Sequence, residues 1–228
     1  MFVCIPKLLN LTQLATVRGS LDGEAVPWVD GRVTAGSQGK HVKNNQQIDE
    51  NSTLAHELGD FILSALERNA LFISAALPHR VYPPLFNRYG EGMYFGTHVD
   101  GAVRNIPGTG QKIRTDLSAT LFLAPPESYD GGELIMENGA DRQRVKLAAG
   151  DMILYPSTSR HCVTPVTRGE RVACFFWIQS LVREDAKREQ LFELDLAIQR
   201  LTRTGADDDA LVRLAAHYHN LLRLWTDM

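Results

Sequence analysis

The sequence predicts a mainly β fold with flanking helices: a double-stranded β-helix (jelly roll) of about eight strands, followed by a C-terminal helical hairpin. Between residues 70 and 180, short apolar runs recur about every ten residues, separated by Gly, Pro and Asp turn signals. After Ser180 the chain becomes charged and helically periodic. With 228 residues, 44% hydrophobic and 22% charged, the chain suffices for one domain with a substantial core and a small appendage.

The segment before the strand-rich part predicts an edge strand and two helices. Residues 2–5 are apolar and short, as expected for an edge strand, and residues 8–17 favour a short helix. A longer amphipathic helix starts at Asn51 or Ser52, either of which is a suitable N-cap.

Two segments outside these elements are candidates for the border of a site. Residues 42–47 are unusually polar, and the simplest interpretation is a solvated loop or edge strand. The alternative is a rim that presents its amides and Lys43 to a substrate. Residues 103–114 contain Gly, Lys and Arg, and we expect a mobile lid there.

The strand-rich part consists of apolar runs bounded by turn residues. These runs are residues 70–75, 81–86, 89–99, 117–124, 129–137, 143–147, 151–155, 161–166 and 171–179.

The last part of the chain predicts two helices. Residues 185–202 and 210–225 are both amphipathic, and residues 205–209 interrupt the pattern, as in a helical hairpin. The hairpin either covers the barrel or forms a homodimer contact. We therefore divide the chain into a jelly-roll domain with N-terminal helices, residues 1–180, and a C-terminal helical segment, residues 181–228.

Composition excludes several classes of function. A net charge of −3 and a pI near 6.2 argue against a nucleic-acid partner. No apolar run approaches the length of a membrane span, and the N-terminal residues lack the features of a signal peptide. The three cysteines, Cys4, Cys162 and Cys174, have no CxxC spacing, which suits a reducing cytoplasm.

The candidate metal site is centred on His98 and Asp100. Because side chains alternate along a strand, these two residues point the same way on an extended backbone. His161 follows a remote apolar run and supplies a third donor. Two imidazoles and one carboxylate form a facial triad that leaves three adjacent positions of Fe(II) open. Structural zinc would need a fourth ligand, and none suggests itself.

Arg171 begins an apolar strand ten residues after His161. A guanidinium in a dry pocket binds a carboxylate through two hydrogen bonds, which would suit an organic cosubstrate. The alternative is an ordinary surface salt bridge, and Glu170 beside it keeps that open. Tyr89 either adds a hydroxyl to the same carboxylate or packs its ring with a wet tip.

These motifs resemble those of the Fe(II)- and 2-oxoglutarate-dependent dioxygenases of the prolyl-4-hydroxylase-like group, and more closely the bacterial PKHD-type hydroxylases. The matching segments extend beyond the metal motif to the helical tail, so the resemblance covers nearly the whole chain. They are residues 30–36, 42–45, 87–100, 131–134, 150–151, 155–157, 161–166 and 169–171.

The resemblance implies an enzyme that hydroxylates its substrate and releases succinate and CO2. It implies that His98, Asp100 and His161 are the catalytic metal ligands, that Arg171 binds the far carboxylate of 2-oxoglutarate and that Tyr89 assists it. It further implies ascorbate dependence and a link to iron uptake. The substrate is unidentified: peptidyl proline, a free amino acid, a siderophore-like metabolite and an amide-rich small molecule all fit.

Two rival interpretations remain. A cupin-like metal protein would use the triad without 2-oxoglutarate, and Arg171 would then point away from the metal pocket. An iron-responsive binding module would dock a partner through the C-terminal helices and release no succinate.

Overall fold

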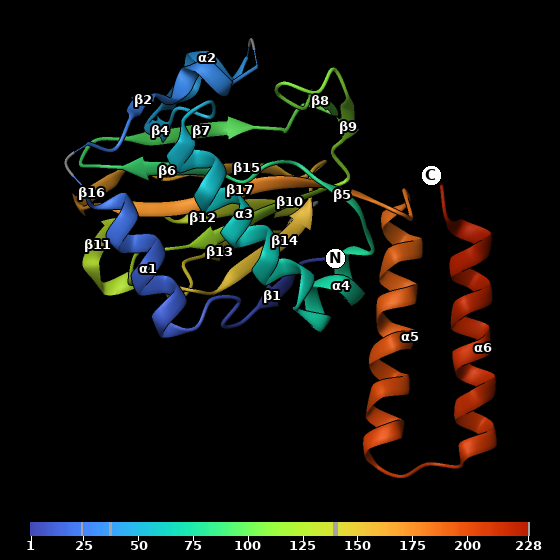
Figure 1. Cartoon of the computed structure of the whole chain (residues 1–228). Coiled ribbons are helices and arrows are strands. Elements are labelled where there is room, and N and C mark those ends of the chain that lie inside the picture. Colours follow the sequence, from blue (N-terminus) through green and yellow to red (C-terminus); the bar gives the residue numbers. More distant parts are fainter. Residues whose placement is uncertain (24, 37, 139–140, 228) are drawn as a thin grey trace.

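The computed structural model describes residues 1–23, 25–36, 38–138 and 141–227, and it contains two antiparallel sheets (Figure 1). A cavity lies between them. In spatial order, the larger sheet contains β1 (Val3–Ile5), β14 (Met152–Pro156), β10 (Leu117–Phe122), β17 (Arg171–Ser180), β6 (Leu85–Tyr89), β4 (Gln46–Ile48) and β2 (Trp28–Asp30), with β5 (Pro78–Val81) also paired to β17. The smaller sheet contains β13 (Asp141–Val145), β12 (Leu134–Asn138), β15 (Arg160–Val163), β7 (Tyr94–His98) and β3 (Lys43–Asn44). Two short hairpins pair β8 (Val103–Asn105) with β9 (Lys112–Arg114), and β11 (Tyr129–Gly131) with β16 (Val166–Gly169). The predicted jelly roll is confirmed.

Alternation along the strands of the larger sheet separates a core face from a cavity face. On β10, Leu117 and Leu121 belong to the main hydrophobic core, whereas Ser118 and Thr120 line the cavity. The same alternation on β17 gives the cavity polar and aromatic side chains.

Helices cover the outer face of the larger sheet (Figure 1). They are α1 (Leu11–Leu21), α3 (Thr53–Glu67) and α4 (Ala70–Ala76), and a short α2 (Gly39–Val42) lies near β7. The first helix begins and ends later than predicted because Asn10 and Gln13 form a capping box that fixes its start. The third begins after Ser52, one of the two predicted N-caps.

Residues 70–75 are helical, so their prediction as one of the strand-like runs is wrong. Asn69 caps this helix by accepting a hydrogen bond from the Phe72 backbone, and Leu77 ends it in a left-handed conformation with φ 43°. Short apolar runs do not distinguish a buried strand from a buried helix by pattern alone.

The polar segment 42–47 includes an edge strand, as the simplest interpretation allows, but alternate residues of it are buried, so it is not a solvated loop. Lys43, Asn45 and Gln47 are 7%, 3% and 1% exposed, and the segment forms β3 and β4. Lys43 lines the cavity, as the alternative interpretation requires.

The C-terminal hairpin is confirmed as α5 (Asp185–Arg203) and α6 (Asp208–Trp225). The first of these helices packs beside α4 and buries Leu191 and Phe192, and the second packs along the first. Both extend away from the sheets (Figure 1). In the described part of the chain, no helix has the length and apolar content needed to cross a membrane.

Candidate functional site

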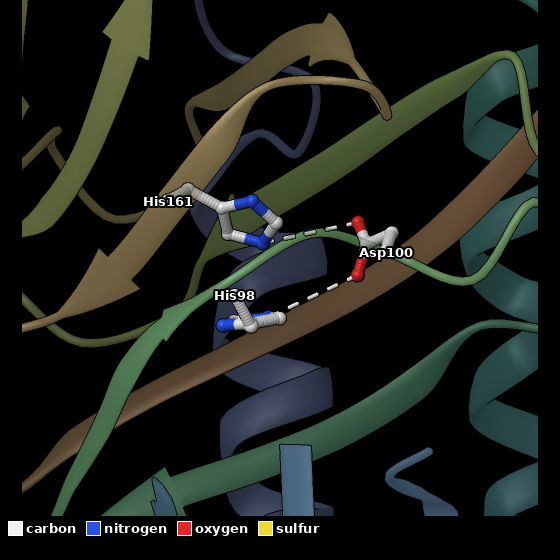
Figure 2. Close-up of side chains that lie close together, drawn as sticks. All are labelled: His98, Asp100 and His161. Carbon is white, nitrogen blue, oxygen red and sulfur yellow. Dashed lines mark ion pairs between the residues drawn. The ribbon is translucent and has the colours of Figure 1, made fainter. Parts of the chain in front are cut away.

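Two imidazoles and a carboxylate, all from β7, β15 or the residues just after β7, point toward one another (Figure 2). His98 ends β7, Asp100 follows two residues later, and His161 lies directly opposite His98 in the register of β15. One ligand atom from each residue lies within 4.8 Å of the other two. The Nε2 atoms of His98 and His161 lie 3.9 and 3.8 Å from the carboxylate oxygens of Asp100.

Backbone carbonyls orient both imidazoles. The Nδ1 atom of His98 lies 2.9 Å from the Gly96 oxygen, and that of His161 lies 3.0 Å from the Ser159 oxygen. When each Nδ1–H donates to its carbonyl, the unprotonated Nε2 faces Asp100. Burial, and then the neighbouring His161, lower the pKa of His98 to about 4, so this ring is neutral and suited to bind a metal.

Two buried serines fix the carboxylate of Asp100. The Ser118 hydroxyl donates to Asp100 Oδ2 at 2.6 Å and lies 2.7 Å from the Ser157 hydroxyl. Outer hydrogen bonds of this kind hold metal ligands in place. Neither serine is among the site residues predicted from the sequence, although Ser118 is a polar residue within the apolar run 117–124.

The triad opens onto a cavity of about 700 Å³ that also contains the Arg171 side chain. Arg171 is 1% exposed, and its nearest side-chain acceptor is Asn87 Oδ1, 3.5 Å from Nη1. Its Nε has no hydrogen-bond partner, and no carboxylate in the described residues lies within ion-pair distance of it. Glu170 instead lies 3.8 Å from Arg88, so the salt-bridge alternative for Arg171 is wrong. A buried cation without a counter-charge is costly, and an anion bound beside this guanidinium would reduce that cost.

Tyr89 lies beside this guanidinium. It faces Arg171 in the register of β6 and β17, and the Arg171 Cζ is 5.2 Å from the centre of its ring. The side chain lines the cavity and is 1% exposed, so its hydroxyl is not the wet tip of the alternative interpretation. Burial raises the pKa of Tyr89, so the hydroxyl keeps its proton and can donate it in a hydrogen bond.

Lys43 is a second cation in the cavity. Its Nζ donates to the Thr34 hydroxyl at 3.2 Å and lies 5.0 Å from the centre of the Phe95 ring, which stacks on His98. Burial, and then the charge of Arg104, lower the pKa of Lys43 to about 7.

Comparison with known proteins agrees with this geometry. Residues 84–179 match the 2OG-Fe(II) oxygenase superfamily, and residues 185–227 match the PKHD-type hydroxylase C-terminal domain. PKHD-type hydroxylases of Burkholderia ambifaria and Paraburkholderia phytofirmans are 63% and 60% identical over 227 residues, which cover 100% of this chain and of each relative. A prolyl hydroxylase from Trichoplax adhaerens, solved with a hypoxia inducible factor peptide, has a TM-score of 0.55 at 17% identity and matches 83% of this chain and 86% of its own.

The fold and the family matches define an Fe(II)- and 2-oxoglutarate-dependent oxygenase. Within that class, the chain belongs to the PKHD-type hydroxylase family, and the resemblance noted in the sequence is confirmed. The cupin-like protein and the iron-responsive binding module are not favoured.

The hydrogen bond from Ser118 to Asp100 is testable by substitution. We expect Ser118→Ala to weaken Co(II) or Fe(II) binding by roughly tenfold or more, because Asp100 loses the bond that orients it. Metal titration against a competing chelator measures this. Ser128→Ala removes a hydroxyl that bonds only the Pro125 backbone at the surface, and it serves as the control. Equal affinities for wild type and Ser118→Ala would contradict the assignment.

Lys43→Met is expected to raise the free energy of unfolding of the metal-free protein at pH 7 by about 1–3 kcal/mol, because a buried amine without a carboxylate partner becomes apolar. The folded pKa of about 7 lies below the ordinary 10.5, so the unfolded chain binds the extra proton between these values. Wild-type stability therefore rises with pH across that range, and the advantage of the variant shrinks. Urea unfolding at neutral and alkaline pH measures both effects, with the exposed Lys112→Met as the control. If the difference in free energy of unfolding between Lys43→Met and wild type did not change with pH, the lowered pKa of Lys43 would be refuted.

Proposed function

We propose that the protein hydroxylates an organic substrate with Fe(II), 2-oxoglutarate and O2, and releases succinate and CO2. The observation that carries this proposal is the buried, unpaired Arg171 in the same cavity as the three converging donors. A metal site without a cosubstrate would not require an unneutralised guanidinium.

The donor set fits ferrous iron. His98, Asp100 and His161 would hold the metal through two neutral imidazoles and one carboxylate. In the described residues, the cluster includes no fourth His, Cys, Asp or Glu, which leaves room for exchangeable ligands. Hydrogen bonds from Ser118 and to the two backbone carbonyls orient all three donors before the metal binds.

Each of the other groups has a defined task. When bound, Fe(II) supplies the O2 activation that allows an unreactive C–H bond to be oxidised. Arg171 would bind the far carboxylate of 2-oxoglutarate, and the Tyr89 hydroxyl would donate to the same group. Phe95 stacks on His98 with ring centroids 3.6 Å apart, which restricts rotation of that imidazole and excludes water from one side.

The cellular setting forms a separate part of the proposal. We propose a cytoplasmic enzyme that depends on ascorbate, serves iron uptake and acts on a small-molecule or peptidyl substrate rather than on nucleic acid or a membrane. The support is the family resemblance, the net charge of −3 and three cysteines that are free in the structure.

We also propose that α5 and α6 form a homodimer contact. The hairpin extends away from the sheets (Figure 1). Leu201, Val212 and Leu224 are exposed on it. Light scattering should give twice the mass of the 25.4 kDa chain; a monomer at micromolar concentration would refute the contact.

The assignment of Arg171 is tested by anaerobic titration of the Fe(II) protein with 2-oxoglutarate, monitored by the visible charge-transfer band of the chelate. We expect Arg171→Gln to require roughly 10- to 100-fold more 2-oxoglutarate, because a charge-assisted bidentate contact is lost. Arg168→Gln is the matched control, since Arg168 is exposed and pairs with Asp130 at the surface.

Loss of a metal ligand gives a second measurement on the same system. We expect His98→Ala to abolish release of succinate in the absence of substrate. Retained succinate release would exclude the proposed triad, and equal 2-oxoglutarate binding by wild type and Arg171→Gln would exclude the carboxylate clamp.

A further inference from the structure

Arg104 is a second guanidinium in the cavity, half-buried overall, and it lies on the predicted lid. It projects from β8, and its Cζ is 4.0 Å from the centre of the Trp177 ring and 5.1 Å from that of Tyr82. Its only hydrogen bond to protein in the described residues is a weak one, 3.5 Å from Nη2 to the Thr34 carbonyl oxygen. The buried Nε has no partner. Aromatic faces stabilise a cation but leave the in-plane N–H groups free to bind an anion.

Lys43 and Arg104 form a pair of neighbouring cations in the cavity. The two charges are close enough for Arg104 to lower the pKa of Lys43, and no carboxylate in the described residues forms an ion pair with either. The nearby acids have other contacts, and Asp100, whose charge raises the pKa of Lys43, accepts a hydrogen bond from Ser118 within the triad. Asp30 pairs with Arg32, and Glu50 accepts a 3.5 Å hydrogen bond from the Tyr82 hydroxyl.

The register of the larger sheet separates this pair from Arg171. Arg171 and Trp177 are six residues apart on β17, which corresponds to about 20 Å of extended backbone. Ser118, directly opposite Trp177 on β10, donates to Asp100, so the triad lies towards the Trp177 end. One molecule of 2-oxoglutarate that binds the metal and Arg171 therefore extends away from Arg104.

We propose that Lys43 and Arg104 form a second anion subsite, which binds a carboxylate of the primary substrate next to the triad. This inference rests on the proposed function, because it assigns Arg171 to 2-oxoglutarate. Four aromatic side chains around the pair, Tyr82, Phe95, Phe175 and Trp177, suit a planar or apolar body attached to that carboxylate. The substrate class is thus a carboxylic acid with an aromatic or bulky apolar group.

The subsite gives Lys43 a role that its burial alone does not explain. An anion at this position would favour the charged form of the amine and supply the missing counter-charge for both cations. The repulsion between Lys43 and Arg104 would then be offset only when the substrate carboxylate is bound.

The test uses the full chain loaded anaerobically with Fe(II) and 2-oxoglutarate. Phenylacetate is the probe, and phenylacetamide is its neutral isostere. Phenyl phosphate tests a different oxyanion, and N-acetyl-glycyl-phenylalanine with a free or amidated C-terminus tests a peptide source of the carboxylate. Binding is followed by the change in the charge-transfer band and by ligand-observed NMR on the Zn(II)-substituted protein.

We expect phenylacetate to bind at least about tenfold more tightly than phenylacetamide, and Arg104→Gln and Lys43→Met each to remove most of that difference. Arg104→Lys should restore part of the loss, which a purely structural role for Arg104 would not predict. Lys112→Met, an exposed substitution on the same lid hairpin, should bind phenylacetate like wild type. If the peptide with a free C-terminus binds more tightly than phenylacetate, the carboxylate comes from a peptide. If phenylacetate binds more tightly, it comes from a small-molecule acid.

Equal binding of the acid and the amide, acid binding unchanged in both variants, or preference for phenyl phosphate over every carboxylate would overturn the subsite. In each case the 2-oxoglutarate band in wild type, and its dependence on Arg171, would remain. Absence of that band in wild type would instead refute the proposed function, so the two failures are distinguishable.

Discussion

The antiparallel pairing of β7 with β15 is the constraint on which the site depends. It sets His98 directly opposite His161, and it leaves Asp100 just beyond the end of the strand, where its carboxylate turns back towards both rings. Because strand side chains alternate, a slip of one residue would move an imidazole to the opposite face of the sheet. The triad is therefore a property of strand register, and the hydrogen bonds from the flanking residues refine an arrangement that the sheet already imposes.

The larger sheet contributes the rest of the cavity at a cost in stability. Its inner face carries Arg171 and borders Lys43, two buried cations without carboxylate partners in the described structure. Its outer face packs against α1, α3 and α4 in a single hydrophobic core, and that burial offsets the cost. The core and the cavity thus lie on opposite faces of the same strands, as the alternation of Leu117, Ser118, Thr120 and Leu121 along β10 shows.

Local patterns were sufficient to predict what depends on one segment or on one residue type. The spacing of His98 and Asp100, the remote His161 and the position of Arg171 at the start of an apolar strand are visible in the sequence, as is the C-terminal hairpin. The helix at residues 70–76 was not predicted, because a seven-residue apolar run fits a strand equally well. Likewise, the polarity of residues 42–47 suggested solvent until the sheets showed Lys43 enclosed.

Features that depend on packing between distant strands could not be predicted. The Ser118–Asp100 hydrogen bond joins residues 18 apart through two different sheets, and the contact of Arg104 with Trp177 joins the lid to the end of β17. In each pair, the sequence around one residue gives no indication that it contacts the other. Register and sheet stacking fix such contacts, and a single sequence specifies these only through the whole fold.

The continuity of β17 from Arg171 to Trp177 has a consequence for regioselectivity. One strand carries both Arg171 and Trp177, the aromatic residue beneath Arg104, so the backbone fixes the spacing between the two ends of the cavity. A substrate held by its acid group at one end would present the same carbon to the oxidising centre each time. The position of the new hydroxyl would then be counted from the carboxylate, and homologues of different chain length would be oxidised at a constant distance from it.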